Sequence, residues 1–377
     1  MQNISLADFL EYRFLSKLQL SPDGSKAAFV VSRQNKQENN YAADIYLAHC
    51  AAHSIKQLTH TGKEHDFVWD GADTLLFPSC RCKEDEAPRF YQKTVFYRLS
   101  LSGGEAYRAF EVPYDVKEIC PCGDGVHYAM AVRIDHTRPD PRTHTMEECE
   151  DAEDYILLEE MPFATNGEGY TSRVRMTLAL YNAETDETKL LTPPMFMLGA
   201  FRWAGKQLVY TGHSYTTVKA KTKGMYAYSL ATGETRTLVE DGALAIYHIG
   251  EEEGTVLFTA SDLKQYGSAS GQDFYKLSLA GGGCEKLLAH ELVPGTSPIT
   301  DSTYGSGNAF VCAQGAAYYI VLDRFQSHIR SIDAAGVQQE ILGFDGGIQM
   351  LDMRGGATVF VGMQKNSLQE LYVLAGG

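Results

Sequence analysis

One unit of about 50 residues recurs along most of this chain of 377 residues. Each copy places a Gly- or Asp-containing turn before an apolar strand, then an aromatic strand, a second Gly turn and a Leu-rich strand. The aromatic strands of successive copies are marked by positions 46, 97, 179, 226, 275, 330 and 372. Several short strands per unit at this period are typical of radial β-sheet repeats. The sequence therefore predicts an all-β fold, a seven-bladed β-propeller of four-stranded antiparallel blades over residues 17–377.

The first copy shows how the turns specify the hairpins. Leu18–Leu20 leads into the turn Ser21-Pro22-Asp23-Gly24, and the strand Ala27–Val31 follows. Proline fixes φ at the second position of a turn, and glycine supplies the left-handed residue that closes it. A β-sandwich, or a two-domain β-protein whose repeat is accidental, is the alternative fold.

The seventh copy is incomplete, because residues 371–374 form its third strand and the fourth is missing. An unpaired edge strand is exposed to unwanted pairing, and proteins usually cover it. Either the N-terminus supplies the missing strand, or the chain is the front part of a longer polypeptide, which we favour. Residues 1–16 form a lead-in segment, in which Ser5 and Asp8 have the spacing of a capping box and predict a short helix.

An antiparallel blade with strands A to D has its A–B and C–D turns on one face of the propeller. Its B–C loops, and the crossings from one blade to the next, lie on the other face. A polar insertion at residues 134–175 separates the second and third strands of the third copy. The insertion, the lead-in segment and a chain leaving the last blade are therefore expected on the B–C face.

The net charge is −15, from 48 acidic and 33 basic residues. Such a charge disfavours binding to nucleic acid and to anionic membranes. Apolar runs fall short of the roughly 18 residues that span a bilayer. Asp8 and Glu11 interrupt the stretch where a signal peptide would be apolar. We expect a cytoplasmic protein whose eight cysteines are reduced thiols.

Several motifs together resemble a known family. They are the turn at 21–24, the run Asn40–Leu47, the segments Glu159–Phe163 and Asn166–Tyr170, and the ending Gln369–Tyr372. They are similar to the N-terminal propeller of prolyl oligopeptidase family serine peptidases, in the branch of acylaminoacyl-peptidase and dipeptidyl-peptidase-like enzymes. Turns of the 21–24 type also occur in TolB-like propellers.

The resemblance implies a non-catalytic domain that gates the access of short peptides to a Ser-Asp-His site and orients them there. That site would lie on a C-terminal α/β-hydrolase domain, which this sequence does not contain. No G-x-S-x-G nucleophile elbow is present, since Gly267–Gly271 has Ala269 at the serine position. We therefore expect no peptidase activity from these residues alone and a serine peptidase as the parent protein.

The insertion holds the candidate substrate-binding residues. Residues 147–160 include eight acidic side chains, and charge-assisted hydrogen bonds from an ammonium group to carboxylates are strong. The resemblance to dipeptidyl-peptidase enzymes, in which a glutamate pair binds the peptide amine, singles out Glu159 and Glu160. Tyr170, Arg173 and Arg175 are expected to contact substrate or the partner domain. A solvated acidic loop is the alternative.

No cofactor or metal is expected. Cys80-x-Cys82 and Cys120-x-Cys122 could form a four-thiolate zinc site, but structural zinc sites prefer two to four intervening residues. Buried thiols are the favoured interpretation. Two other functions stay open: a stand-alone propeller scaffold for protein–protein interaction, and a metal-dependent lactonase-type propeller. Homo-oligomerisation and peptide specificity are left undetermined.

Overall fold

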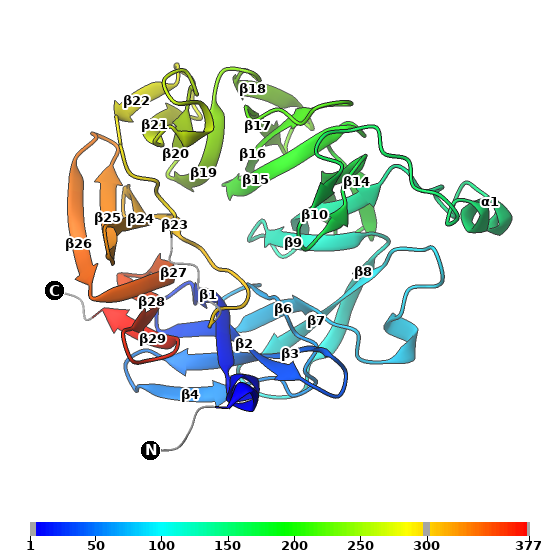
Figure 1. Cartoon of the computed structure of the whole chain (residues 1–377), viewed down its shortest axis with the longest axis horizontal. Helices are drawn as coiled ribbons and strands as arrows, with labels where there is room; N and C mark the ends of the chain where they lie inside the picture. The colour runs from blue at the N-terminus through cyan, green and yellow to red at the C-terminus, as the bar shows by residue number, and fades with distance from the viewer. Residues whose placement is uncertain (1–4, 297–301, 375–377) are drawn as a thin grey trace.

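The computed structural model describes residues 5–296 and 302–374, and it shows seven β-sheets arranged around a central axis (Figure 1). Six blades have four antiparallel strands and the last has three among the described residues. All seven aromatic-strand positions lie in the third strand of a blade. The predicted seven-bladed propeller with an incomplete last blade is therefore confirmed.

Within every blade the strands follow the chain from the axis outward. Blades 1 to 4 are β1 (Arg13–Leu20), β2 (Lys26–Asn35), β3 (Asn40–His49) and β4 (Ser54–Gln57); β5 (Val68–Trp69), β6 (Thr74–Pro78), β7 (Thr94–Ser100) and β8 (Tyr107–Val112); β9 (Asp115–Pro121), β10 (His127–Asp135), β13 (Val174–Asn182) and β14 (Glu187–Leu190); β15 (Phe196–Ala204), β16 (Gln207–Ser214), β17 (Gly224–Ser229) and β18 (Thr235–Val239).

Blades 5 to 7 continue the same arrangement. They are β19 (Ala245–Glu252), β20 (Thr255–Ser261), β21 (Asp273–Ser278) and β22 (Glu285–Leu288); β23 (Phe310–Ala313), β24 (Ala316–Asp323), β25 (Gln326–Asp333) and β26 (Gln338–Phe344); β27 (Gly346–Arg354), β28 (Ala357–Gln364) and β29 (Glu370–Leu374). Short 3-10 helices are η1 (Leu6–Glu11), η2 (Lys83–Asp85) and η3 (Gly267–Ala269). Ser5 and Asp8 form the predicted capping box of η1.

The first turn has the chemistry that its sequence predicts. Gly24 adopts a φ of 73°, and its N–H donates to the Ser21 carbonyl at 2.8 Å. The Asp23 carboxylate accepts hydrogen bonds from the Ser21 hydroxyl and from the Ser25 N–H and hydroxyl, and these bonds lower its pKa to about 2. A Cβ atom on Gly24 would lie 2.4 Å from the Arg354 carbonyl. The turn therefore needs glycine both for its conformation and for its approach to blade 7.

The hydrophobic core lies between neighbouring blades. Seven clusters of buried apolar side chains occupy the seven blade interfaces. Between blades 1 and 2, for example, Ile45 packs with Phe77 and Tyr97. Because each blade packs against its two neighbours, these interfaces hold the ring together.

Among the described residues, blades 7 and 1 share no strand. β1 pairs with β2 as the innermost strand of blade 1, so it does not complete blade 7. Side chains make the connection instead: the Asp352 carboxylate accepts the Leu20 N–H at 2.7 Å, and the Gln369 amide bonds both backbone groups of Leu15, at 2.8 and 3.1 Å. We call these contacts the blade 1–blade 7 seam.

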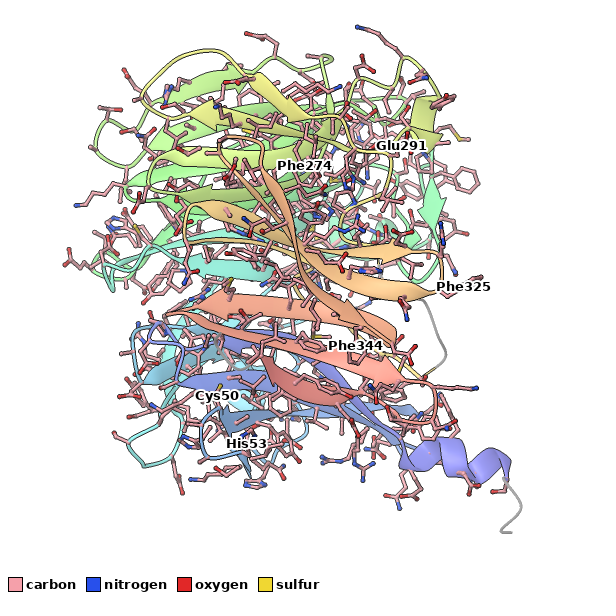
Figure 2. The ribbon with its side chains drawn as sticks, turned by 90° about the vertical axis from the view of Figure 1, so that its left-hand side faces the viewer. Cys50, His53, Phe274, Glu291, Phe325 and Phe344 are labelled. Carbon is pink, nitrogen blue, oxygen red and sulfur yellow. The ribbon has the colours of Figure 1, made fainter. Side chains whose placement is uncertain are left out.

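The two faces of the propeller are distinct, as the topology predicts. In Figure 2, η1 and Phe325 of the β24–β25 turn lie on the B–C face, whereas Cys50 and His53 of the β3–β4 turn lie toward the opposite one. The described helices have at most six residues, so none of them could cross a membrane.

The insertion in blade 3 leaves the ring and projects away from it (Figure 1). Its flanking strands β10 and β13 reach Asp135 and Val174, so the connection itself occupies residues 136–173. It contains the helix α1 (Met146–Asp151) and a small hairpin of β11 (Ala164–Thr165) and β12 (Gly169–Tyr170). Its end returns to the ring, where Met161 forms a bridge with Val218 in the β16–β17 loop of blade 4.

Candidate functional site

The base of the insertion is held by a buried ion pair. Arg175 of β13 has no exposed side-chain surface, and its guanidinium bonds both carboxylate oxygens of Glu160, at 2.5 and 3.0 Å. It also donates to the carbonyls of Met195 and Tyr215, and it lies 3.8 Å from the centre of the Tyr215 ring. Arg175 therefore ties the insertion to blade 4.

Glu160 is fully used by these contacts. Its side chain is 1% exposed, and it accepts the Arg173 N–H at 2.7 Å in addition to the Arg175 bonds. Burial pushes the pKa of Glu160 upward, but the hydrogen bonds from Arg175 and from the Arg173 N–H outweigh it, and the pKa lies below its usual value. The carboxylate is thus ionised and structural, with little surface to offer a ligand.

Glu159 and Arg173 form a second pair at the surface. Their side chains are 43% and 37% exposed and meet at 2.8 Å. Tyr170, in the neighbouring hairpin, is exposed as well. The structure therefore brings all five predicted residues to the insertion, but it divides them into a buried pair, Glu160 and Arg175, and an accessible group, Glu159, Arg173 and Tyr170.

A pocket of about 540 Å³ opens beside this base, between blades 3 and 4. Its charged lining residues are Asp115, Lys117, Arg133, Glu168 and Lys219. Lys117 pairs with Asp115 at 2.8 Å, whereas Arg133 and Lys219 form no ion pair with any residue in the described part of the chain. The pocket can therefore hold polar and anionic groups of a small ligand. Its volume lies in the range of small-molecule sites.

Sequence reasoning missed Arg133, Lys219 and Tyr215 as pocket residues. Arg133 was one of many charged residues at the end of a strand, and Lys219 lies in a loop of another blade. The available signal was topological: both positions fall on the B–C face, where the insertion was expected. Their proximity depends on how the insertion folds back onto blade 4, which a repeat pattern does not specify.

The cysteine pairs are not grouped as a metal site would require. Within residues 5–296 and 302–374, no set of three or more His, Cys, Asp or Glu side chains is placed to hold a metal ion. The interpretation of four buried thiols is wrong for Cys82, which is exposed, while Cys80, Cys120 and Cys122 are partly buried. Cys80 and Cys82 lie in the β6–β7 loop.

The fold resembles, over nearly its whole length, the propeller domains of prolyl oligopeptidase-family peptidases. The acylaminoacyl peptidase of Pyrococcus horikoshii superposes with a TM-score of 0.72 at 15% identity, covering 98% of this chain and 52% of that one. The propeller domain of the Trilobed protease from Pyrococcus furiosus, described as having an open velcro topology, superposes with a TM-score of 0.64 at 12% identity. The superposition covers 98% of this chain and 95% of that domain.

Among curated proteins, the uncharacterized peptidase YuxL of Bacillus subtilis is 28% identical over 201 residues, which cover 52% of this chain and 29% of YuxL. The chain thus spans about half of the acylaminoacyl peptidase and matches less than a third of YuxL. No family model matches the sequence.

Proposed function

We propose that this chain is the non-catalytic propeller of a serine peptidase of the prolyl oligopeptidase type. In this proposal an α/β-hydrolase domain with a Ser-Asp-His site covers the B–C face. The propeller limits access to that site to short peptides and helps to orient them. The cytoplasmic location expected from the sequence is part of the same proposal.

The observation that carries the proposal is the placement of exposed apolar side chains. Most large apolar residues that face solvent belong to η1, the B–C loops or the crossing before β23, and therefore to the B–C face. They are Phe9, Tyr91, Met146, Tyr155, Ile156, Leu157, Leu158, Met161, Phe163, Tyr170, Val218, Tyr266, Val293, Tyr304, Phe325 and Leu368. Apolar surface gathered on one side of a molecule marks an interaction site. The peptidases that this chain resembles support a hydrolase domain as the partner.

The product of the whole gene tests the proposal directly. It should hydrolyse peptides of a few residues and leave folded proteins intact, and the coding sequence after Gly377 should contain a G-x-S-x-G elbow. A stop codon immediately after residue 377 would instead favour the stand-alone scaffold, in which the same apolar face binds another protein.

Within this proposal, Glu159 is the carboxylate that recognises a peptide α-amine, because Glu160 is engaged by Arg175. In the whole enzyme, Glu159→Gln should raise the KM for peptides with a free N-terminus about tenfold, the effect of losing one charge-assisted hydrogen bond. The KM for N-acetylated peptides should not change. Glu153→Gln is the matched control, since Glu153 lies in the same insertion and forms a similar surface pair with Arg89 of the β6–β7 loop. Equal effects on both peptide types would exclude amine recognition.

A further inference from the structure

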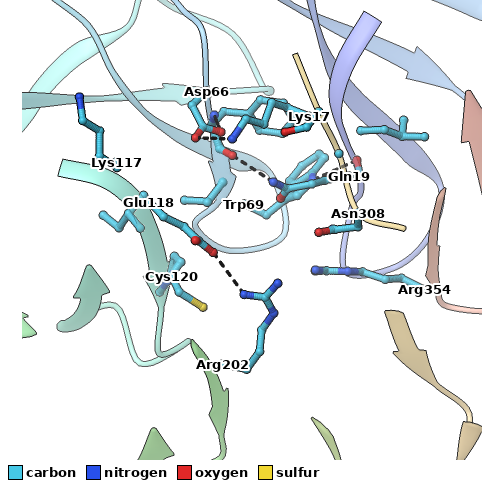
Figure 3. Close-up of a pocket in the computed structure, with 17 residues that line it drawn as sticks. Lys17, Gln19, Asp66, Trp69, Lys117, Glu118, Cys120, Arg202, Asn308 and Arg354 are labelled. Carbon is cyan, nitrogen blue, oxygen red and sulfur yellow. Dashed lines mark hydrogen bonds and ion pairs between the residues drawn. The ribbon is translucent and has the colours of Figure 1, made fainter. Parts of the chain in front are cut away.

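A second pocket, of about 440 Å³, lies in the axial channel of the propeller. Its walls come from innermost strands of several blades, including β1, β5, β9 and β15, from the end of β27, and from residues 306–308 (Figure 3). Lys117 lines both this pocket and the one beside the insertion. The channel pocket therefore begins near the B–C face. It extends to Arg202 and Arg354, which lie near the other ends of their strands.

The channel pocket is richer in cations than the rest of this acidic chain. Lys17, Lys117, Arg202 and Arg354 line it, against the two carboxylates of Asp66 and Glu118. Lys17 is neutralised by Asp66 at 2.9 Å, and Lys117 by Asp115, which lies outside this pocket. Arg202 pairs with Glu118 at 3.2 Å and Arg354 lies 3.6 Å from Asp352, so the capacity that the two arginines have left for a ligand is their unused N–H groups.

Neither guanidinium is saturated. Arg202 uses only Nη1, toward Glu118 at 3.2 Å and the Phe201 carbonyl at 2.7 Å. The Nε of Arg354 lies 3.6 Å from the Asp352 carboxylate, beyond hydrogen-bond distance. In the described chain, the remaining N–H groups of both arginines form no hydrogen bond with protein.

Asp352 lies near Arg354 but does not form a hydrogen bond with it. The carboxylate is 3% exposed, and one of its oxygens accepts the Leu20 N–H at 2.7 Å. Burial raises the pKa of Asp352, against the opposing effect of Arg354. Asp352 is thus engaged by the β1 backbone and stays beyond hydrogen-bond distance of Arg354.

The two guanidiniums share one space with a neutral polar group. Figure 3 shows the side chains of Arg202, Arg354 and Asn308 directed into the pocket. Arginine presents a planar fork that matches a carboxylate with two parallel hydrogen bonds. Arg202 already binds Glu118 through Nη1, so a ligand carboxylate would be bound by the N–H groups that both forks leave unused, and the walls limit that ligand to a small molecule or a chain end.

We propose that Arg202 and Arg354, assisted by Asn308, form a carboxylate-binding site in the axial channel, and that the site takes the C-terminal carboxylate of a short peptide. The site would hold a peptide by its end far from the B–C face. Binding of this kind does not depend on the proposed peptidase role, because it uses only residues of this chain.

The chain carries its own reporters for this site. Its two tryptophans are Trp69, which lines the pocket, and Trp203, which is adjacent to Arg202 and donates to the Cys120 carbonyl at 2.9 Å. Trp69 donates to the Gln19 carbonyl at 3.3 Å. Intrinsic fluorescence should therefore respond when a ligand enters the channel.

The experiment titrates the 377-residue chain with N-acetyl-Ala-Ala, with its C-terminal amide and with inorganic phosphate, and follows tryptophan fluorescence. We expect saturable binding of the free acid and at least tenfold weaker binding of the amide and of phosphate. Arg202→Gln and Arg354→Gln should each weaken binding of the acid at least tenfold. Arg354→Lys, which keeps the charge but not the fork, should give an intermediate loss.

The control variant is Arg324→Gln, which removes one exposed arginine from the β24–β25 turn and should bind the acid as the parent chain does. Circular dichroism checks that each variant is folded. If a glutamine variant does not fold, the binding measured for Arg354→Lys still tests the site. Equal binding of acid and amide, stronger binding of phosphate than of the acid, or no saturable response would each overturn the proposal.

Discussion

Arg175 and Glu160 show how a single buried pair can decide which residues are available for function. Both side chains are almost completely removed from solvent, and removing one member of such a pair costs about 3–5 kcal/mol because the other charge stays buried. Their role is therefore to fix the base of the insertion. Glu159, one residue earlier, stays accessible because its partner Arg173 is at the surface.

His213 near the same site makes folding sensitive to pH. The residue is 1% exposed, and neither ring nitrogen has a hydrogen-bond partner among the described residues. Burial lowers its pKa; Asp241 opposes this effect, and Lys219, Lys223 and Arg175 add to it. The unfolded chain, with a histidine pKa near 6.5, therefore takes up a proton that the folded chain resists. The free energy of unfolding should therefore keep its full value above pH 6.5 and fall as the pH drops below 6.5.

We predict that His213→Phe reduces this loss. The free energy of unfolding of the parent chain should fall more steeply than that of the variant between pH 6.5 and 5, by up to about 1.4 kcal/mol per pH unit. Urea unfolding at several pH values measures the difference. The exposed His60 provides the control as His60→Gln. Parallel pH profiles for the parent and His213→Phe would show that His213 is not the cause.

At the scale of elements, the strands were predictable and their irregular connections were not. The spacing of aromatic strands placed all seven third strands, because alternation and turn residues are local signals. The β22–β23 connection gave no such signal. Its described end lies against blades 1 and 7: the Ser306 carbonyl accepts the Lys17 N–H at 2.8 Å, and the Asn308 carbonyl accepts the Leu351 N–H at 2.7 Å.

The candidate site was predictable to the same extent. The insertion and its acidic residues stand out from the repeat, so Glu159 and Glu160 could be selected. Which glutamate is free depends on the position of Arg175, and this position is set by contacts with Met195 and Tyr215 of blade 4. Such contacts join residues from different blades, and no local pattern in the sequence encodes them.

Gly305 allows the β22–β23 connection to approach β1. Its φ is 81°, and a Cβ atom there would lie 2.8 Å from the Ser16 Cβ. We predict that Gly305→Ala lowers the free energy of unfolding by about 1–3 kcal/mol, from backbone strain and steric conflict together. Gly254→Ala is the matched control, because Gly254 has a φ of 79° and open space around it. Thermal unfolding should show a smaller loss for Gly254→Ala, and equal losses would exclude the steric contribution.

The whole molecule depends on how its ends are joined. Each blade interface has its own apolar cluster, and the one between blades 7 and 1 includes Leu18, Leu20, Val359 and Val361. In place of strand pairing, this interface has the Asp352 and Gln369 hydrogen bonds to the β1 backbone. Since a propeller blade is stabilised mainly by its two neighbours, the blade 1–blade 7 seam is the place where the ring can open.

Gln369→Ala should loosen the seam selectively. The Gln369 side chain is buried and bonds both the N–H and the carbonyl of Leu15, so its removal leaves two backbone groups without partners and should cost about 1–3 kcal/mol. Amide hydrogen exchange should rise in β1 and in β27–β29, while the strands of blades 3 to 5 keep their protection. The exposed Gln364, the last residue of β28, gives the control variant Gln364→Ala, which should leave exchange unchanged. A uniform rise over all seven blades would mean that the ring unfolds as one cooperative unit and that the seam is no weaker than the other interfaces.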